Sequence, residues 1–356
     1  MKYFPKKLTM TWIRNSYKEG SLSPEELAGE IVRRAEKYRD YNIWIVAPDL
    51  KRMMDYIEKL PKDMESLPLW GIPFAVKDNI DVAGSPTTAA CPDYAYDPKE
   101  DAAVVKKLIK AGAFPVGKTN LDQFATGLVG TRSPYGEVKN ALDPELISGG
   151  SSSGSAVSVA LGMAAFSLGT DTAGSGHVPA ALNCLVGYKP SLGAWSTKGV
   201  VPACASLDCV TVFANSLEDA EEVNFAARGV DEECCWSREY EEPLQKLPQK
   251  ICLAKDGVTF YGPYADIYRA KWEQAKRRIE DMGITVEYID YTMFSKAASI
   301  LYDGPWVAER WKDLGDFVES HPGKVFPVTE TILRSGDKPE HTARKVFEAM
   351  HQLQAY

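Results

Sequence analysis

Apolar residues recur at helical spacing in several segments of the chain, and each such segment leads into a short apolar run. The first stripe consists of Leu27, Ile31, Val32 and Ala35. Ser23 before it, followed by Pro24 and then Glu26, is typical of a capped helix start. The pattern therefore predicts a helix from Ser23 toward Tyr38 and a short strand over residues 42–46.

The order of helix and then strand recurs three times. An apolar stripe begins after Asp101, which we expect to cap a helix, and ends at Gly112, and a buried strand follows over residues 114–117. The two other pairs are helix 155–161 with strand 164–168, and helix 265–282 with strand 284–289. Such alternation predicts an α/β fold with a parallel or mixed sheet.

The apolar stripe of the last predicted helix runs almost to the final residue, Tyr356. Its members are Ala343, Val346, Phe347, Met350 and Leu353. An apolar helix face needs a surface to pack against. We therefore expect the chain to stop before its fold is complete, and the alternative is a terminal helix docked on the rest of the domain.

Composition and charge narrow the classes of protein that fit. The 356 residues are 45% hydrophobic and 25% charged, as in a globular protein, and the net charge of -8 argues against a nucleic-acid or anionic-membrane partner. No apolar stretch is long enough to span a bilayer, and the N-terminus lacks the apolar core of a signal peptide. Seven cysteines without a CxxC pair, and only four histidines, predict neither a disulfide framework nor a structural zinc site. We expect a cytoplasmic protein.

Two glycine-rich segments each hold a serine with candidate chemistry. Ser151 lies within residues 149–155 and Ser175 within residues 169–176. The first segment leads directly into an apolar helix, which disfavours a flexible linker. Neither segment contains GxxxxGK[ST] or GxGxxG, which disfavours a phosphate-binding loop, and Ser175 is not in a GxSxG turn. A catalytic interpretation is left, together with Lys77 at the end of an apolar run.

A lysine and two serines can form a nucleophile whose base is not histidine. Lys77 could take the proton of Ser175 through Ser151, provided that its amine is neutral. The pKa of free lysine is about 10.4, so Lys77 must be desolvated, and the apolar residues before it favour this. The turn 172–175 can direct several backbone N–H groups at one point, as an oxyanion hole requires. Taken alone, Lys77 would be a surface lysine paired with Asp78. Only the three elements together favour acyl transfer on an amide, with no metal or cofactor.

A Ser-His-Asp triad is the alternative catalytic arrangement. His177 lies two residues after Ser175, too close for its ring to reach the hydroxyl in line. The other histidines, in a distant helical region without a motif, are His321, His341 and His351. We therefore assign His177 to packing or to hydrogen bonds that support the site.

Lys77 and the segments 149–155 and 169–176, at this spacing, resemble the amidase signature family of Ser-cisSer-Lys hydrolases, and the likeness covers about residues 69–214. It implies the α/β amidase signature fold, with a central mixed sheet flanked by helices on both faces. It also implies that Ser175 is the nucleophile, that Ser151, after a cis peptide, is the bridging serine, and that Lys77 is the general base. The implied oxyanion donors are the N–H groups of Thr172, Ala173, Gly174 and Ser175.

Residues 197–209 and 302–310 are further similar to allophanate hydrolases. That similarity implies that Tyr302 and Arg310 bind the substrate carboxylate, which suits the planar fork of a guanidinium. The implied reaction is hydrolysis of the terminal amide of allophanate, a small anionic amide, with release of ammonia. It also implies a functional link to urea carboxylase, and we expect a homodimer. From the residues alone, a surface helix with Arg310 solvated beside Glu309 would be preferred.

The chain departs from this family in two places. His177 stands where an arginine is usual, which bears on the rigidity of the Asp171 region. The family also continues into a last core strand, and allophanate hydrolases often into a further domain, neither of which we expect here. We predict one amidase domain over residues 1–356. Its parts are a helical segment over 1–60, a catalytic core over 61–230 and a substrate-side helical part over 231–356.

Two other functions stay open. One is an amidase for another small amide, such as carboxybiuret, malonamate or a neutral amide, which rates on anionic and neutral amides would separate. The other is a catalytically silent fragment. His177 and the expected missing strand favour it, whereas the intact Lys77, Ser151 and Ser175 disfavour it.

Overall fold

The structure, a computed structural model, describes residues 3–241, 246–256 and 258–356. The chain forms two compact units. The first comprises Met1–Tyr240 and Glu309–Ser335, and the second comprises Glu241–Ala308 and Gly336–Tyr356. Every candidate site residue except Tyr302 therefore belongs to the first unit. The predicted single domain, with divisions near residues 60 and 230, stays a prediction.

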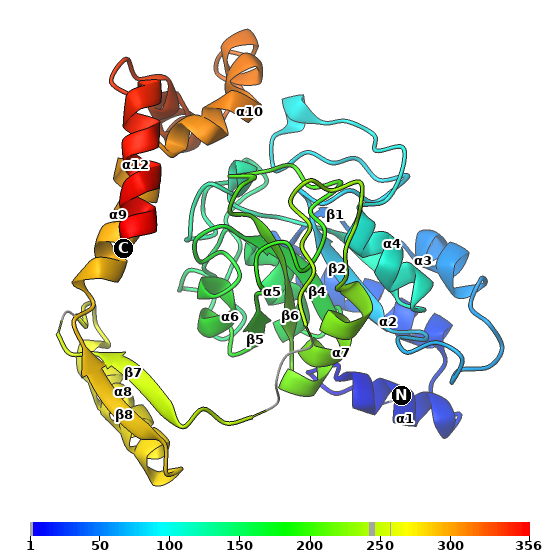
Figure 1. Ribbon diagram of the computed structural model, residues 1–356. Helices are drawn as coiled ribbons and strands as arrows, with labels where there is room; N and C mark the ends of the chain where they lie inside the picture. The colour runs from blue at the N-terminus through cyan, green and yellow to red at the C-terminus, as the bar shows by residue number, and fades with distance from the viewer. Residues whose placement is uncertain (1–2, 242–245, 257) are drawn as a thin grey trace. The chain divides into compact units, whose positions relative to one another are not determined.

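A six-stranded mixed sheet is the centre of the first unit (Figure 1). Its strands are β1 (Trp44–Val46), β2 (Pro73–Lys77), β3 (Phe114–Thr119), β4 (Phe166–Asp171), β5 (Val186–Tyr188) and β6 (Cys209–Ala214). Their order in space is β1-β3-β2-β4-β6-β5. Strand β2 is parallel to β3 and β4, whereas β1 is antiparallel to β3, and β6 is antiparallel to β4 and β5. The expected mixed sheet is confirmed.

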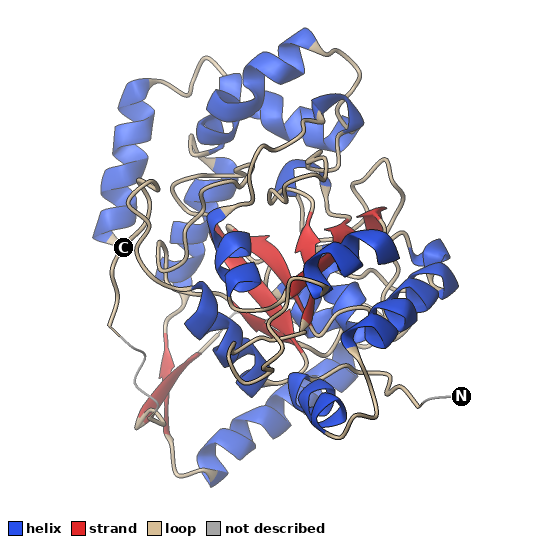
Figure 2. Cartoon of the chain, turned by 90° about the vertical axis from the view of Figure 1, so that its right-hand side faces the viewer, coloured by secondary structure: helices blue, strands red, loops and turns tan. Residues whose placement is uncertain are grey.

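Helices of the first unit flank this sheet (Figure 2). The helices of the first unit are α1 (Met10–Lys18), α2 (Pro24–Lys37), α3 (Leu50–Ile57), α4 (Ala103–Lys110), α5 (Ser153–Ala160), α6 (Val178–Leu182), α7 (Leu217–Ala227), most of α10 (Val307–Ser320) and α11 (Pro327–Arg334). Those that contact its strands are α3, α4, α5, α6 and α7. Helix α5 packs against β2, β3, β4 and β6, whereas α7 packs against β5 and β6 and contacts α4. Short 3₁₀ turns lie at Arg39–Tyr41, Pro92–Tyr94, Gln123–Ala125 and Ser335–Asp337.

The middle of the sheet is fully buried. Every residue of β2, β4 and β6 is buried, and Phe74 of β2 stacks on Phe166 of β4 with ring centroids 5.2 Å apart. Strands that are buried on both faces consist of nearly continuous apolar runs, which is why the sequence marks them. A charged side chain at the end of such a strand, as Lys77 is, must find its partners inside the protein.

The predicted helix start at Ser23 is confirmed. The Ser23 hydroxyl accepts the N–H of Glu26, and the Glu26 carboxylate accepts the N–H of Ser23, so each satisfies a donor of the first turn of α2. The elements around the serine run are shifted from prediction. Helix α5 begins at Ser153, before the predicted 155, and β4 ends at Asp171, beyond the predicted 168.

The prediction that Asp101 caps a helix is wrong. Ala102 is the residue before α4, and its side chain makes no capping hydrogen bond. The Asp101 carboxylate instead accepts the N–H of Ala83 at 2.8 Å. The local pattern predicted that the Asp101 carboxylate would accept a hydrogen bond from the first turn of α4. It instead accepts one from the N–H of Ala83, in a loop distant along the chain.

The second unit contains a β-α-β element and two further helices. Strands β7 (Lys250–Ala254) and β8 (Thr285–Ile289) pair in parallel and are connected by α8 (Ala265–Asp281). Helices α9 (Thr292–Asp303) and α12 (Ala343–Ala355) contact each other. The predicted helix and strand over 265–289 and the predicted last helix are confirmed. Within the described ranges, no helix is long and apolar enough to cross a membrane.

Candidate active site

Lys77 is the last residue of β2, the strand between β3 and β4. Its side chain is fully buried. Its Nζ lies 2.8 Å from Ser151 Oγ and 2.7 Å from Thr170 Oγ1 on β4. The structure thus brings Lys77 and Ser151 into contact from distant parts of the chain, and their catalytic roles stay a prediction.

The backbone around Ser151 is held from two directions. The next residue, Ser152, donates from Oγ to the Thr170 carbonyl at 3.0 Å and accepts the Thr170 N–H at 3.3 Å. The Ser151 carbonyl accepts the N–H of Asp122 at 3.1 Å. The peptide between Gly150 and Ser151 is cis, as the resemblance implied. Ser151 is therefore tied both to β4 and to the loop after β3.

Ser175 lies on a turn that directly follows β4 and is organised by Asp171. The Asp171 carboxylate accepts the N–H of Gly174 at 2.9 Å and that of Gly176 at 2.6 Å. Gly174 has a φ of 126°, which residues with a side chain rarely adopt. In the described part of the chain, no hydrogen bond joins the hydroxyls of Ser151 and Ser175, so the proton path between them stays a prediction.

His177 supports the same turn, as the sequence predicted. Its Nδ1 lies 2.7 Å from Asp171 Oδ2, although 61% of the side chain is exposed. The position where the family usually has an arginine therefore still carries a hydrogen bond to Asp171. The Ser-His-Asp alternative is not favoured, because within the described ranges the hydrogen bond of this ring goes to Asp171 and none joins it to the Ser175 hydroxyl.

Two of the residues predicted to form the oxyanion hole already make hydrogen bonds to carboxylates. The N–H of Gly174 donates to Asp171, so Gly174 can bind an oxyanion only by leaving that carboxylate. The Thr172 hydroxyl donates to the carboxylate of Asp208 and holds the beginning of the turn. The oxyanion role of Thr172, Ala173 and Gly174 stays a prediction.

Burial sets the protonation of Lys77. Desolvation lowers the pKa of its amine from 10.5 to about 7, and the nearby carboxylates of Asp122, Asp208 and Asp171 oppose this shift. Near pH 7 a large fraction of the amine is therefore neutral, which is the form that a general base requires. The expectation of a desolvated lysine is confirmed.

Arg310 reaches this part of the first unit on α10. Its Nη1 lies 3.0 Å from Thr126 Oγ1. Burial raises the pKa of Asp208, and the charge of Arg310 is among the effects that oppose this rise. Because Asp208 also accepts the Thr172 hydroxyl, Arg310 lies in the surroundings of the nucleophile turn. The interpretation of Arg310 as a solvated surface residue is wrong.

Glu309 fixes the start of α10. Its carboxylate accepts the Ser206 N–H at 2.8 Å, the Ser206 hydroxyl at 2.6 Å and the Cys204 thiol at 2.9 Å. Burial, and then the neighbouring Glu309, raise the pKa of the Cys204 thiol, so it stays protonated and can donate. Asp208 accepts the N–H of Cys204 at 3.1 Å. The segment around Cys204 therefore connects α10 to the turn that begins at Thr172.

Tyr302, the other predicted substrate-binding residue, lies on α9 in the second unit. Its contact with the substrate carboxylate stays a prediction.

Three polar residues that act on Lys77 were missed in the sequence. Thr170 is its second hydrogen-bond partner, and Asp122 and Asp208 are buried carboxylates whose charges raise its pKa. Thr170 shares a glycine segment with Ser175 and lies in a buried strand, which is a signal that could have been used. Asp122 and Asp208 lie in irregular segments, where no local pattern marks them.

The groups gathered here include those that acyl transfer on an amide requires. A buried amine, a hydroxyl in contact with it and a serine on a tight turn are the components of a nucleophile with its base. Among the residues that the structure describes, no group of three His, Cys, Asp or Glu side chains could hold a metal ion.

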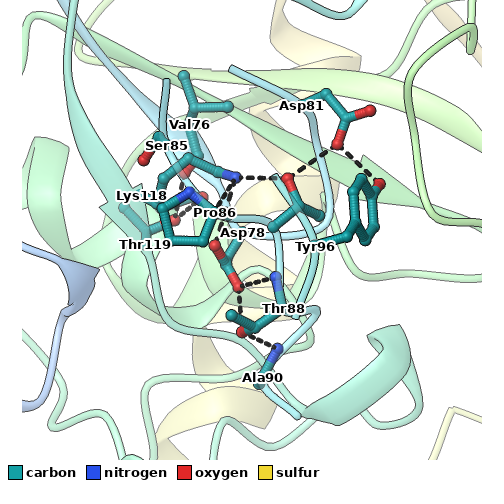
Figure 3. A network of polar contacts seen from close by, with 12 residues as sticks. Val76, Asp78, Asp81, Ser85, Pro86, Thr88, Ala90, Tyr96, Lys118 and Thr119 are labelled. Atoms are coloured by element: carbon teal, nitrogen blue, oxygen red, sulfur yellow. Dashed lines mark hydrogen bonds and ion pairs between the residues drawn. The ribbon is translucent and has the colours of Figure 1, made fainter. Parts of the chain in front are cut away.

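A second buried lysine lies on the neighbouring strand (Figure 3). Lys118 Nζ is 3.3 Å from Asp78 Oδ1 and also donates to Thr87 Oγ1 at 3.0 Å. Asp78 Oδ2 accepts the N–H of Thr88 at 3.0 Å and its hydroxyl at 2.5 Å. Burial raises the pKa of Asp78 and lowers that of Lys118, and the attraction between the charges opposes both shifts. Asp78 is thus paired with Lys118, and not with Lys77 at the surface.

We expect Lys118→Met to destabilise the fold strongly. It leaves the Asp78 carboxylate buried without its cation, and breaking a buried pair in this way costs about 3–5 kcal/mol. For a chain of this size the Tm should fall by roughly 5–10 °C in a thermal unfolding experiment. The control is Lys18→Met, whose partner Glu65 is 2.9 Å away with both side chains more than half exposed. An exposed pair contributes about 1 kcal/mol or less, so an equal loss in both variants would contradict the prediction.

Comparison with known proteins identifies the family. The amidase family matches residues 26–346 of the chain. Urea amidolyase from Saccharomyces cerevisiae is 47% identical over 304 residues, which are 83% of this chain and 16% of that protein. The chain therefore spans only a small part of this relative.

Solved structures agree with this match. Allophanate hydrolase from Kluyveromyces lactis superposes with a TM-score of 0.88 at 39% identity, over 98% of this chain and 57% of that one. Urea amidolyase from the same organism gives a TM-score of 0.89 at 39% identity, over 98% of this chain and 21% of that one. The expected fold is confirmed by these neighbours. Since the family match spans most of the residues and includes the whole Lys77, Ser151 and Ser175 arrangement, the chain belongs to the amidase family.

Proposed function

We propose that this chain hydrolyses the terminal amide of allophanate and releases ammonia. The observation that carries the proposal is Lys77, a fully buried lysine with a pKa of about 7 whose amine contacts Ser151. A structural lysine at this position would gain more from a carboxylate partner, whereas its two hydrogen-bond partners are hydroxyls. This is the setting of a base that takes a proton from a hydroxyl.

In the first half of the reaction, Ser175 Oγ attacks the amide carbonyl carbon, and its proton passes through Ser151 to Lys77. The oxyanion that forms accepts hydrogen bonds from backbone N–H groups of the turn at Thr172 and Ala173. The intermediate then collapses. The C–N bond breaks, the leaving nitrogen receives the proton back from Lys77 through Ser151, and ammonia departs.

In the second half, water hydrolyses the acyl-enzyme. Lys77 and Ser151 take a proton from the water as its oxygen attacks the ester carbonyl, and the Ser175 oxygen leaves and regains a proton. The products are free enzyme and N-carboxycarbamate, the dicarboxylate that remains when the amide nitrogen of allophanate is replaced by oxygen.

The site distinguishes allophanate from neutral amides by binding the carboxylate of allophanate. Arg310 supports this part of the proposal, because it lies near the turn of Ser175 and its planar guanidinium can bind a carboxylate through two parallel hydrogen bonds. The phenol donor that the resemblance assigns to Tyr302 stays a prediction. The names of two similar proteins, urea amidolyase and allophanate hydrolase, also support allophanate as the substrate. They give no such support to carboxybiuret, malonamate or a neutral amide.

The proposal is tested by comparing ammonia release from freshly prepared allophanate and from biuret, its neutral analogue. We expect kcat/KM to be higher for allophanate, and Arg310→Lys to lower kcat/KM for allophanate by roughly 10- to 100-fold through loss of the bidentate contact. The value for biuret should change less than about threefold, because biuret has no carboxylate to lose a contact. The matched control is Arg39→Lys, an exposed arginine in the 3₁₀ turn after α2.

Two results would count against this assignment. Equal loss on both amides would show that Arg310 does not bind the carboxylate. A folded protein that releases no ammonia from either amide would favour the silent-fragment alternative. A reaction that carboxylates urea, as urea carboxylase does, would supply the substrate. That link, the homodimer and the cytoplasmic location stay predictions.

A further inference from the structure

Asp122 is a buried carboxylate that the mechanism above does not use. Its side chain is fully buried. Oδ2 accepts the N–H groups of Val129 and Gly130 at 3.1 and 3.0 Å, and Oδ1 accepts the N–H of Arg132 at 2.9 Å. Across the described ranges, Asp122 takes part in no ion pair. Its negative charge is therefore held inside the protein by backbone N–H groups and is not cancelled by a cation.

The position of Asp122 connects it to the bridging serine. Its own N–H donates to the Ser151 carbonyl at 3.1 Å. Its Oδ2 also packs against Gly150, where a Cβ atom would come within 2.1 Å of it. A side chain at residue 150 could not be accommodated without moving this carboxylate. Asp122 thus contacts both residues of the Gly150–Ser151 segment and helps to fix its position.

Three buried carboxylates from three elements raise the pKa of Lys77, and they differ in their hydrogen-bond partners. Asp171, at the end of β4, is hydrogen-bonded to His177, and Asp208, before β6, lies under the influence of Arg310. Asp122 lies in the loop after β3, where the Arg132 guanidinium donates to the Thr126 carbonyl. Of the three, Asp122 is the one whose side-chain hydrogen bonds, within the described ranges, all come from backbone N–H groups.

We propose that Asp122 is a positioning residue for the general base, and that its carboxylate is the counter-charge for the ammonium that Lys77 becomes when it accepts the Ser175 proton. This inference rests on the proposed function, since it assumes that Lys77 is the base. In this proposal no proton moves to Asp122. Its N–H meanwhile keeps Ser151 in contact with the lysine amine.

The charge contributions at Lys77 agree with this geometry. Burial alone would lower the pKa of Lys77 further, and Asp122 is the strongest of the charges that raise it. A base whose pKa lies far below the working pH accepts a proton weakly. Removing the Asp122 charge should therefore shift the pKa of Lys77 downward and slow proton transfer, even where the amine is fully neutral.

The test is the pH profile of ammonia release from allophanate for the parent chain and Asp122→Asn. In the parent, kcat/KM should rise with pH and level off above about 7. In Asp122→Asn the midpoint should move to lower pH by about half a unit or more, and the plateau kcat should fall about tenfold with KM nearly unchanged. Asp122→Glu restores the charge and should return the midpoint to that of the parent. Asp122→Ser is a second neutral variant whose smaller side chain leaves space for water at the three N–H groups.

Asp219→Asn is the matched control. Asp219 is a buried carboxylate that accepts a backbone N–H, from Met10 at 3.3 Å, and it is not among the groups that shift Lys77. It should leave the midpoint unchanged. An active, folded Asp122→Asn with the midpoint of the parent would overturn the inference and leave the proposed function intact. Failure of both neutral variants to fold would also overturn it, in favour of a purely structural carboxylate. A parent chain with no rise in kcat/KM near pH 7 would instead count against Lys77 as the base.

Discussion

Ser175→Ala is expected to reduce ammonia release from allophanate by a factor on the order of 10⁴ to 10⁶, because it removes the atom that attacks the carbonyl. The buried amine of Lys77 and the hydroxyl of Ser151 would remain, but neither can replace an attacking oxygen at the position of the turn. The loss should appear in kcat. Substrate binding should be retained, since Arg310 is unchanged.

The decisive measurement is the acyl-enzyme itself. In single-turnover mixtures quenched with acid, mass spectrometry of the parent should show a species heavier by the acyl group, and Ser175→Ala should show none. Ser23→Ala is the matched control. It removes the cap of α2, which costs about 1 kcal/mol of stability, and should leave the acyl-enzyme unaffected. Formation of an acyl-enzyme by Ser175→Ala would assign the nucleophile to another residue, and Ser151 would be the first to examine.

The residues that could be predicted from the sequence are those whose role depends on residues close to them along the chain. Ser151 and Ser175 are embedded in glycine and serine because a tight turn and a close helix approach need small residues. Lys77 is marked because it ends an apolar run that becomes the central strand β2. The capped start of α2 belongs to the same class, since Ser23 and Glu26 are within one helical turn of each other.

The contacts that residues make across strands could not be predicted from the sequence, even where the residue itself lies in a marked segment, as Thr170 does. Thr170 contacts Lys77 because β4 pairs in parallel with β2, and Asp122 lies nearby because β3 pairs with the other side of β2. Strand order and register depend on which of the possible long-range strand pairings is most stable, and this cannot be read from a single sequence. The same limit explains Asp101, which lost its predicted capping role to a contact with Ala83.

The pairing of the two buried lysines shows how the fold separates their tasks. Lys77 is the last residue of β2 and Lys118 the residue before the last of the adjacent β3, so a sequence pattern would treat them alike. Lys118 has a carboxylate partner in Asp78, whose charge opposes the lowering of the Lys118 pKa by burial (Figure 3). Among the described residues, the hydrogen-bond partners of Lys77 are the hydroxyls of Ser151 and Thr170. Burial lowers the pKa of both lysines, so their different partners are what separates the lysine that contacts a candidate bridging serine from the one that is ion-paired.

Lys77→Met should lower kcat by about 10² to 10⁴, the usual contribution of a general base, with a smaller effect than Ser175→Ala because the nucleophile remains. The pH profile gives the sharper test. The pKa of Lys77 is lowered to about 7, so below that pH the amine becomes protonated and kcat/KM should fall tenfold for each pH unit. In Lys77→Met that dependence should disappear, and the residual rate should follow hydroxide alone. Lys18→Met, at the exposed end of α1, is the matched control and should keep the profile of the parent.

His177→Asn tests the support of the nucleophile turn, because the His177 ring contacts Asp171 beside Ser175. If Lys77 is the base, His177→Asn should weaken the turn and lower kcat, while the midpoint of the pH profile stays near 7. A midpoint that persists in Lys77→Met and vanishes in His177→Asn would contradict the assignment of Lys77 as the base. In that case Lys77 would be a structural lysine.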